Sequence, residues 1–199
     1  MASPVKVNIV VEGNLDEIVV TKTLNQFYIQ VNKVYEKGGK ASILKNLRKY
    51  NAAAQSSSWP WIVVVDLDNP KNCAPPFIKK HLPQRNPRLL FRVAVMEIES
   101  WLLADRDQLA EFLAISRDLI PYHVEKEEDP KTTIINLARR SPNRDIREDL
   151  IPQKDSGAKE GPRYTTRMMQ FVLKNWRPAI AARKADSLRR FIKAARTLL

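Results

Sequence analysis

Four short apolar runs divide the first hundred residues of this chain, and amphipathic segments separate them. The clearest run is Trp61–Val65, in which every residue is large and apolar. The other three runs cover residues 5–11, 27–34 and 89–96. Short runs rich in Val and Ile are typical of strands that are buried on both faces. Because such strands alternate here with segments of helical periodicity, the sequence predicts an α/β fold with a mainly parallel four-stranded sheet flanked by helices.

The pattern changes after Asp105 and is helical from there to the last residue. We expect helices over residues 106–115, 131–140, 163–176 and 186–198, separated by linker-like stretches at 121–130 and 152–162. The sequence therefore predicts an α/β domain over residues 1–105. It also predicts an all-helical extension over 106–199 that packs back onto this domain.

Positive charge is concentrated in the last third of the chain. The 199 residues include 34 Lys or Arg and 22 Asp or Glu, which gives a net charge of +12. Residues 1–138 hold 18 basic and 16 acidic side chains, whereas residues 139–199 hold 16 basic and six acidic ones. A concentrated positive field attracts polyanions, so nucleic acid is the favoured partner, DNA before RNA. A surface kept for solubility, or a patch for acidic lipid or protein, stays open.

Composition also excludes several other classes of protein. No apolar run approaches the ~20 residues that cross a bilayer, and the first residues lack the apolar core of a signal peptide. The single Cys73 excludes an internal disulfide and a cysteine-rich zinc site. We therefore expect a cytoplasmic protein that does not enter a membrane.

Acidic residues follow three of the four predicted strands. In an open parallel sheet, ligands bind outside the carboxyl ends of the strands, so these acids should share one edge. Their oxygen ligands suit Mg²⁺ or Mn²⁺, and a pair of such ions promotes phosphodiester cleavage. The predicted metal ligands are Glu12, Asp16, Asp66, Asp68, Glu97 and Glu99.

Each part of this pattern also has a simpler explanation. Acids such as Asp16 and Glu97 are favourable near the start of a helix, and residues 68–70 (Asp-Asn-Pro) form a good turn in their own right. Residues 38–42 (Gly-Gly-Lys-Ala-Ser) lack the full pattern of a phosphate-binding loop and indicate a turn followed by a helix. The shared placement of the acids at strand ends is therefore the stronger signal.

Three segments resemble the acidic motifs of TOPRIM domains, the catalytic fold shared by topoisomerases, primases and OLD-family nucleases. They are Val11-Glu12-Gly13-x-x-Asp16, Val65-Asp66-Leu67-Asp68 and Glu97-Ile98-Glu99-Ser100-Trp101-Leu102-Leu103-Ala104-Asp105. The chain is more similar still to the DUF4276 family, a bacterial TOPRIM-like group that shows Glu-x-Glu-x-Trp-Leu-Leu-Ala-Asp and later Ala-Arg-Arg-Ser and Gly-Pro-x-Tyr. Residues 138–141 and 161–164 match these later segments. The resemblance implies a TOPRIM-like, Rossmann-like catalytic domain.

The resemblance also implies roles for the acids and a cofactor, Mg²⁺ or Mn²⁺. Glu12 would be a metal ligand or general acid/base, and Asp16 a second ligand. Asp66 and Asp68 would be paired ligands with a catalytic role. Either Glu97 or Glu99 would complete a second metal site, and the sequence does not choose between them.

The family resemblance also bears on a lysine and on partners. OLD-family nucleases use a downstream lysine, for which Lys154 and Lys159 are the candidates. Because the chain carries no ATPase module, an ATPase partner would be a separate protein.

The basic tail offers candidate contacts to nucleic acid. Gly161-Pro162 precedes a predicted helix, and free backbone N–H groups at such a helix start bind phosphate. Arg163 and Arg167 lie one turn apart and would flank that phosphate. Tyr164 either stacks on a base or packs inward. Lys154, Lys159, Arg189 and Arg190 complete the predicted contacts.

The leading functional hypothesis is a metal-dependent endonuclease that hydrolyses phosphodiester bonds, an activity that suits a defence or mobile-element system. The alternative is a nucleic-acid-binding accessory module whose metal site is not catalytic. A small-molecule phosphotransferase is a weaker third reading, because a small substrate has no use for so much positive charge.

Overall fold

The computed structural model describes residues 4–35, 38–69 and 73–199, and its centre is a parallel β-sheet. Within these residues the sheet has four strands in the order β2-β1-β3-β4, and every neighbouring pair is parallel. The strands are β1 (Val5–Val10), β2 (Ile29–Tyr35), β3 (Trp61–Asp66) and β4 (Leu89–Ala94). The predicted α/β fold with a mainly parallel sheet is therefore confirmed, and β1 and β3 lie at its centre.

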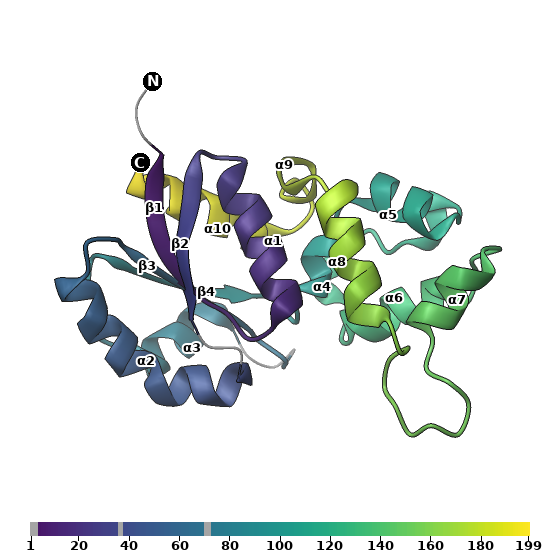
Figure 1. The fold of residues 1–199 in the computed structure, drawn as a ribbon, viewed down its shortest axis with the longest axis horizontal. Helices are drawn as coiled ribbons and strands as arrows, with labels where there is room; N and C mark the ends of the chain where they lie inside the picture. The colour runs from purple at the N-terminus through teal and green to yellow at the C-terminus, as the bar shows by residue number, and fades with distance from the viewer. Residues whose placement is uncertain (1–3, 36–37, 70–72) are drawn as a thin grey trace.

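Helices cover both faces of the sheet (Figure 1). Helices α2 (Gly39–Ser56) and α3 (Ala74–His81) pack on one face, with Val63 and Val65 of β3. Helices α1 (Asn14–Asn25) and α10 (Asp186–Ala195) cover the other face, where Ile62 and Val64 point. Burial on both faces explains why the run that forms β3 is apolar throughout rather than alternating.

The remaining helices form a layer beside the sheet (Figure 1). The α-helices are α4 (Glu99–Leu103), α5 (Arg106–Leu113), α6 (Pro130–Ala138), α7 (Arg144–Leu150), α8 (Tyr164–Lys174) and α9 (Pro178–Ala181). The 3-10 helices are η1 (Arg117–Leu119), η2 (Val124–Lys126) and η3 (Arg196–Leu198). Helix α8 packs along α1, and α10 returns to β4. One hydrophobic core therefore contains Val7 of β1 as well as Phe191 of α10, and it does not break at residue 105.

Several local predictions need correction. Helices α7 and α9 were not expected, and η2 lies within the predicted linker at 121–130. The strand predicted over 89–96 ends at Ala94, because Met96 has a positive φ of 63° that no strand accommodates. Helix α2 begins at Gly39, three residues earlier than the Ser42 start that the sequence suggests. Of the turn predicted over residues 68–70, the last residue, Pro70, lies outside the described residues.

The segment Trp101–Asp105 holds the helical layer together. The indole Nε1 of Trp101 donates to Ser187 Oγ (2.7 Å), and its carbonyl oxygen accepts from Trp176 Nε1 (3.0 Å). Asp105 is fully buried and accepts hydrogen bonds from the backbone N–H and the guanidinium of Arg177. These residues therefore have a structural role, since Trp101 and Asp105 both contact segments more than 70 residues away. None of the helices in the described ranges has the length and apolar character needed to cross a membrane.

Candidate functional site: an acidic pocket at the carboxyl ends of the strands

A pocket of about 310 Å³ lies at the carboxyl ends of β1 and β3. Four of the predicted acids line it, together with one lysine and one tyrosine from the helical layer. These residues are Glu12, Asp16, Asp66, Glu99, Lys131 and Tyr164. The expected gathering of acids at one sheet edge is therefore observed for four of the six predicted residues.

Glu12 and Asp66 connect the ends of the two central strands. One carboxylate oxygen of Glu12, Oε1, accepts a hydrogen bond from the backbone N–H of Asp66 at 2.8 Å. Burial raises the pKa of Glu12 above its ordinary value, although this hydrogen bond opposes the shift. Since β1 and β3 are neighbours in the sheet, the bond holds the Glu12 carboxylate in place beside Asp66.

The acids of the pocket repel one another. The pKa of Asp66 lies well above its ordinary value because of burial and then because of the charges of Asp16 and Glu99. Burial is also the main reason that the pKa of Asp16 rises to about 6. These carboxyl groups therefore gain protons at higher pH than free ones, and a bound cation would relieve the same repulsion.

Glu99 enters the pocket from the first turn of α4 and is only 3% exposed. Burial raises its pKa to about 7, although Lys131 opposes the shift. The Tyr164 hydroxyl lies 3.4 Å from Glu99 Oε1, and Lys131 Nζ lies 3.7 Å from the same oxygen. Glu97 instead accepts a hydrogen bond from the backbone N–H of Lys131 at the start of α6 (3.1 Å). Of the two glutamates that the sequence left open, Glu99 is therefore the one that lines the pocket.

Asp68, like Glu97, is a predicted ligand that is not among the residues lining this pocket. Its side chain is half exposed, and Lys40 Nζ lies 3.0 Å from its Oδ2 atom. Lys40 also donates to the carbonyl oxygen of Leu67 (3.0 Å). Lys40 comes from the Gly-Gly-Lys-Ala-Ser segment, which forms the first turn of α2. Nothing in the sequence around Lys40 indicated that it would pair with Asp68.

The donor chemistry of the pocket fits Mg²⁺ or Mn²⁺, because carboxylate oxygens are the ligands that these ions prefer. The present spacing fits less well. Over residues 4–35, 38–69 and 73–199, no three Asp, Glu, His or Cys side chains lie close enough to hold a metal ion. Glu12, Asp66 and Glu99 would hold such an ion only after their side chains move toward one another.

The lysine beside the acids is Lys131, not one of the two that the sequence suggested. Lys154 and Lys159 are exposed in the segment between α7 and α8. Burial lowers the pKa of Lys131, but the charges of Glu99 and Glu160 more than offset this effect and raise it above its ordinary value. Sequence reasoning missed Lys131 because it lies 32 positions beyond Glu99 with no motif around it.

The backbone N–H groups at Gly161 and Arg163, which the sequence predicted to be free for a phosphate, are engaged within the chain. The N–H groups of Gly161 and Arg163 donate to the carbonyl oxygens of Leu150 (3.0 Å) and Asp149 (3.1 Å), so they are not free. A Cβ atom at Gly161 would lie 2.3 Å from the Asp149 carbonyl oxygen, which explains the glycine. Tyr164 is 1% exposed, so it packs inward and cannot stack on a base.

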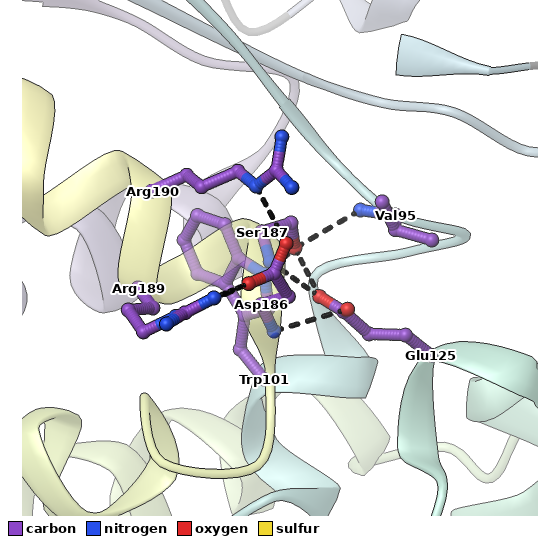
Figure 2. Close-up of polar contacts among 7 residues, drawn as sticks. All are labelled: Val95, Trp101, Glu125, Asp186, Ser187, Arg189 and Arg190. Carbon is purple, nitrogen blue, oxygen red and sulfur yellow. Dashed lines mark hydrogen bonds and ion pairs between the residues drawn. The ribbon is translucent and has the colours of Figure 1, made fainter.

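The arginines predicted to bind nucleic acid already pair with acids of the chain. Arg167 Nε lies 2.5 Å from Asp149 Oδ2, whereas the more exposed Arg163 lies 3.9 Å from the same carboxylate group. Arg189 and Arg190 both pair with Asp186 on the exposed side of α10 (Figure 2). Arg163, Arg189 and Arg190 keep exposed side chains and stay candidate contacts, while Arg167 has a structural partner.

Comparisons with protein-family models, curated proteins and solved structures give no match to this chain. The resemblance to TOPRIM domains and to the DUF4276 family therefore stays a prediction. Function is therefore inferred from the geometry of the acidic pocket and from the charge of the chain.

Proposed function

We propose that this protein is a metal-dependent nuclease that hydrolyses phosphodiester bonds of nucleic acid, with DNA favoured over RNA. The observation that carries the proposal is the meeting of Glu12, Asp16, Asp66 and Glu99 with Lys131 in one pocket at the carboxyl ends of the strands. Cleavage of a phosphodiester requires positive charge beside the phosphate, and the carboxylates that would hold a divalent cation border the same space as the ammonium group of Lys131. The basic side chains of residues 139–199 support the proposal, since they would hold a polyanion near the pocket.

The chain's own residues would divide the chemistry among them. Mg²⁺ or Mn²⁺ held by Glu12, Asp66 and Glu99 would offset the negative charge that develops on the phosphate. Lys131 would contact a non-bridging phosphate oxygen, because its ammonium group lines the pocket. Asp16, whose pKa is raised to about 6, is suited to accept a proton from the attacking water near neutral pH.

A nucleic-acid-binding accessory module with a non-catalytic metal site is the alternative, and two observations favour it. No three acids of the described ranges are close enough to hold an ion. The two lysines near the acids already have carboxylate partners, since Lys40 pairs with Asp68 and Lys131 lies near Glu99. A site that is neutralised by its own lysines has less need of a catalytic cation.

The fold family, the partners and the location belong to the same proposal. A TOPRIM-like fold of the DUF4276 kind would suit an Mg²⁺-dependent nuclease that works with a separate ATPase partner in a defence or mobile-element system. Cytoplasmic nucleic acid would be its substrate. Cleavage of matched DNA and RNA duplexes would distinguish the two substrates.

A plasmid nicking and linearisation assay with Mg²⁺ or Mn²⁺ tests the proposal. Asp66→Asn keeps the shape of the side chain and the backbone N–H that donates to Glu12, so the fold should persist. Because the variant lacks the carboxylate charge that would help to hold the metal ion, cleavage should fall by about 100-fold or more. Asp107→Asn is the matched control, because Asp107 is exposed and pairs with Arg117 outside the pocket. If the wild type retards DNA without cutting it under any metal, the accessory module takes the place of the nuclease.

A further inference from the structure

A second pocket, of about 250 Å³, lies along the outer edge of the sheet. Strand β4 is the edge strand, and the pocket lies between it and the first turns of α3 and α10. Pro75, Ile78 and Val93 give the pocket an apolar side, and Arg92 and Arg190 give it a basic one. The pocket shares none of its lining residues with the acidic pocket, so it is a separate feature.

Arg92 is the unusual residue of this pocket. Its Nε atom is enclosed, yet no hydrogen-bond acceptor reaches it from the described part of the chain. Burial lowers the pKa of the guanidinium, and the charges of Arg85 and Arg190 lower it further. An enclosed donor without an acceptor is unfavourable by itself, and the nearby charges of Arg85 and Arg190 add to the cost at Arg92.

The acids of the pocket do not meet this need, because other donors already engage them (Figure 2). Glu125 accepts the backbone N–H groups of Asp186 (3.0 Å) and Ser187 (2.8 Å) at the start of α10. The carboxylate of Asp186 is shared between Arg189 and Arg190. Among the residues that the structure describes, Arg92 Nε therefore has no acceptor, and a ligand in the pocket would supply one.

The hydroxyl of Ser187 is also fully engaged. Its Oγ accepts from Trp101 Nε1 (2.7 Å) and from the backbone N–H of Val95 (3.3 Å), and it donates to Glu125 Oε1. These bonds join α4, η2, α10 and the residue after β4, so this part of the pocket lining is held by four segments of the chain. The pocket is therefore built by tertiary contacts before any ligand arrives, which favours binding.

We propose that this pocket binds a small organic anion, a phosphate or carboxylate group on a compact apolar body, with Arg92 as its anchor. The guanidinium offers a planar pair of donors that matches both kinds of oxyanion, and Arg190 borders the same space. The apolar side would take the body of the ligand. At about 250 Å³ the pocket is smaller than the ~300–1,000 Å³ of typical ligand sites, so it suits a small molecule rather than a nucleic-acid strand. This site goes beyond the proposed nuclease function and does not depend on it.

Isothermal titration calorimetry on the full chain tests the proposal, with phenyl phosphate, benzoate and inorganic phosphate as separate probes. EDTA in every sample removes divalent ions, so the acidic pocket contributes no metal-bound phosphate. We expect Arg92→Met to weaken binding of the best probe by about tenfold or more, because one charge-assisted contact is lost. Arg140→Met removes an exposed arginine from a different region and should leave the affinity unchanged. Tighter binding of phenyl phosphate than of benzoate would assign the ligand to phosphates, and the reverse to carboxylates.

Two further measurements distinguish a binding residue from a structural one. Without ligand, Arg92→Met should be at least as stable toward urea as the wild type, because it removes an enclosed N–H donor that has no acceptor among the described residues. If Arg92→Met does not fold, Arg92→Lys serves instead, since it keeps the charge but loses the planar pair of donors and should bind several-fold more weakly. Equal affinity in the wild type and the folded variant, or no binding of any probe up to about 10 mM, overturns the proposal.

Discussion

Lys131 Nζ lies 3.7 Å from Glu99 Oε1 and 3.1 Å from Glu160 Oε2, so one ammonium group joins three separate segments at the edge of the acidic pocket. The charge of Lys131 lowers the pKa of Glu99, yet burial outweighs it and leaves that pKa at about 7. The carboxyl group of Glu99 therefore changes its charge near neutral pH. This behaviour makes the pocket sensitive both to protons and to cations.

The first prediction concerns the pH dependence of stability. Folding raises the pKa of Glu99 from an ordinary 4.5 to about 7, so the native state binds this proton more tightly than the unfolded chain. The free energy of unfolding should therefore fall as the pH rises from about 4.5 to about 7. Glu99→Gln has no carboxyl group to ionise at this position, so it avoids this fall in the free energy of unfolding. It should therefore be more stable than the wild type above pH 7, by up to about 3 kcal/mol.

Urea denaturation between pH 4.5 and pH 8 in the presence of EDTA measures both proteins. Glu111→Gln is the control, because Glu111 is exposed on α5 and its replacement should not change the slope of the free energy of unfolding against pH. Asp16 and Asp66 keep part of the slope in the Glu99→Gln variant, since their pKa values are raised as well. Identical slopes for the wild type and Glu99→Gln would contradict this assignment.

The second prediction concerns metal binding. At pH 7.5 an excess of Mg²⁺ or Mn²⁺ at about ten times its Kd should stabilise the wild type by ~1.4 kcal/mol, a Tm increase of roughly 3–5 °C. Asp66→Asn should abolish the increase. At pH 5.5 the increase should shrink, because protons compete with the metal for Asp16 and Glu99, whose pKa values are about 6 and about 7. Differential scanning fluorimetry measures the Tm increase. If the metal ion still raises the Tm of Asp66→Asn, the metal binds elsewhere.

The third prediction separates structural arginines from surface ones. Arg167→Ala should lower the free energy of unfolding by about 1–3 kcal/mol, because it leaves the nearly buried carboxylate of Asp149 without its 2.5 Å partner. Arg163→Ala should cost less than about 0.5 kcal/mol, since its side chain is exposed and 3.9 Å away. Urea denaturation of the two variants makes the comparison.

Nucleic-acid binding should depend on the surface arginines instead. Replacing Arg163, Arg189 and Arg190 together with Ala should weaken binding of a labelled DNA duplex and reduce the slope of affinity against salt concentration. Fluorescence anisotropy at several salt concentrations measures both effects. An unchanged salt slope would show that the duplex lies on another surface.

The fourth prediction concerns Asp105, which is fully buried against Arg177. Asp105→Asn removes the charge that holds the backbone and guanidinium of Arg177 at the start of α9. It should destabilise the protein by about 3 kcal/mol, and Asp107→Asn on the exposed side of the same arginine by less than about 0.5 kcal/mol. Chemical denaturation distinguishes the two. Equal losses in the free energy of unfolding for the two variants would mean that the burial of Asp105 does not increase its contribution to stability.

The sequence by itself determined the sheet and the edge at which the acids meet. A strand buried on both faces has to be apolar along its whole length, and Trp61–Val65 shows this without any knowledge of its neighbours. Parallel strands place their carboxyl ends at one edge, so Glu12 and Asp66 were predicted to come together. Their position follows from the direction of the chain, which local patterns reveal.

Only the tertiary structure decided what surrounds those acids. Tyr164 lies 65 positions beyond Glu99, and whether its ring turned inward depended on how α8 packs along α1. The packing of α6 against α4 brought Lys131, rather than Lys154 or Lys159, to the acids. The contact between α7 and α8 engaged the backbone N–H groups before α8 with Asp149 and Leu150. Local periodicity states which face of a helix is apolar, but not which other helix will cover that face. Contacts between distant helices therefore depend on the packing of the whole core.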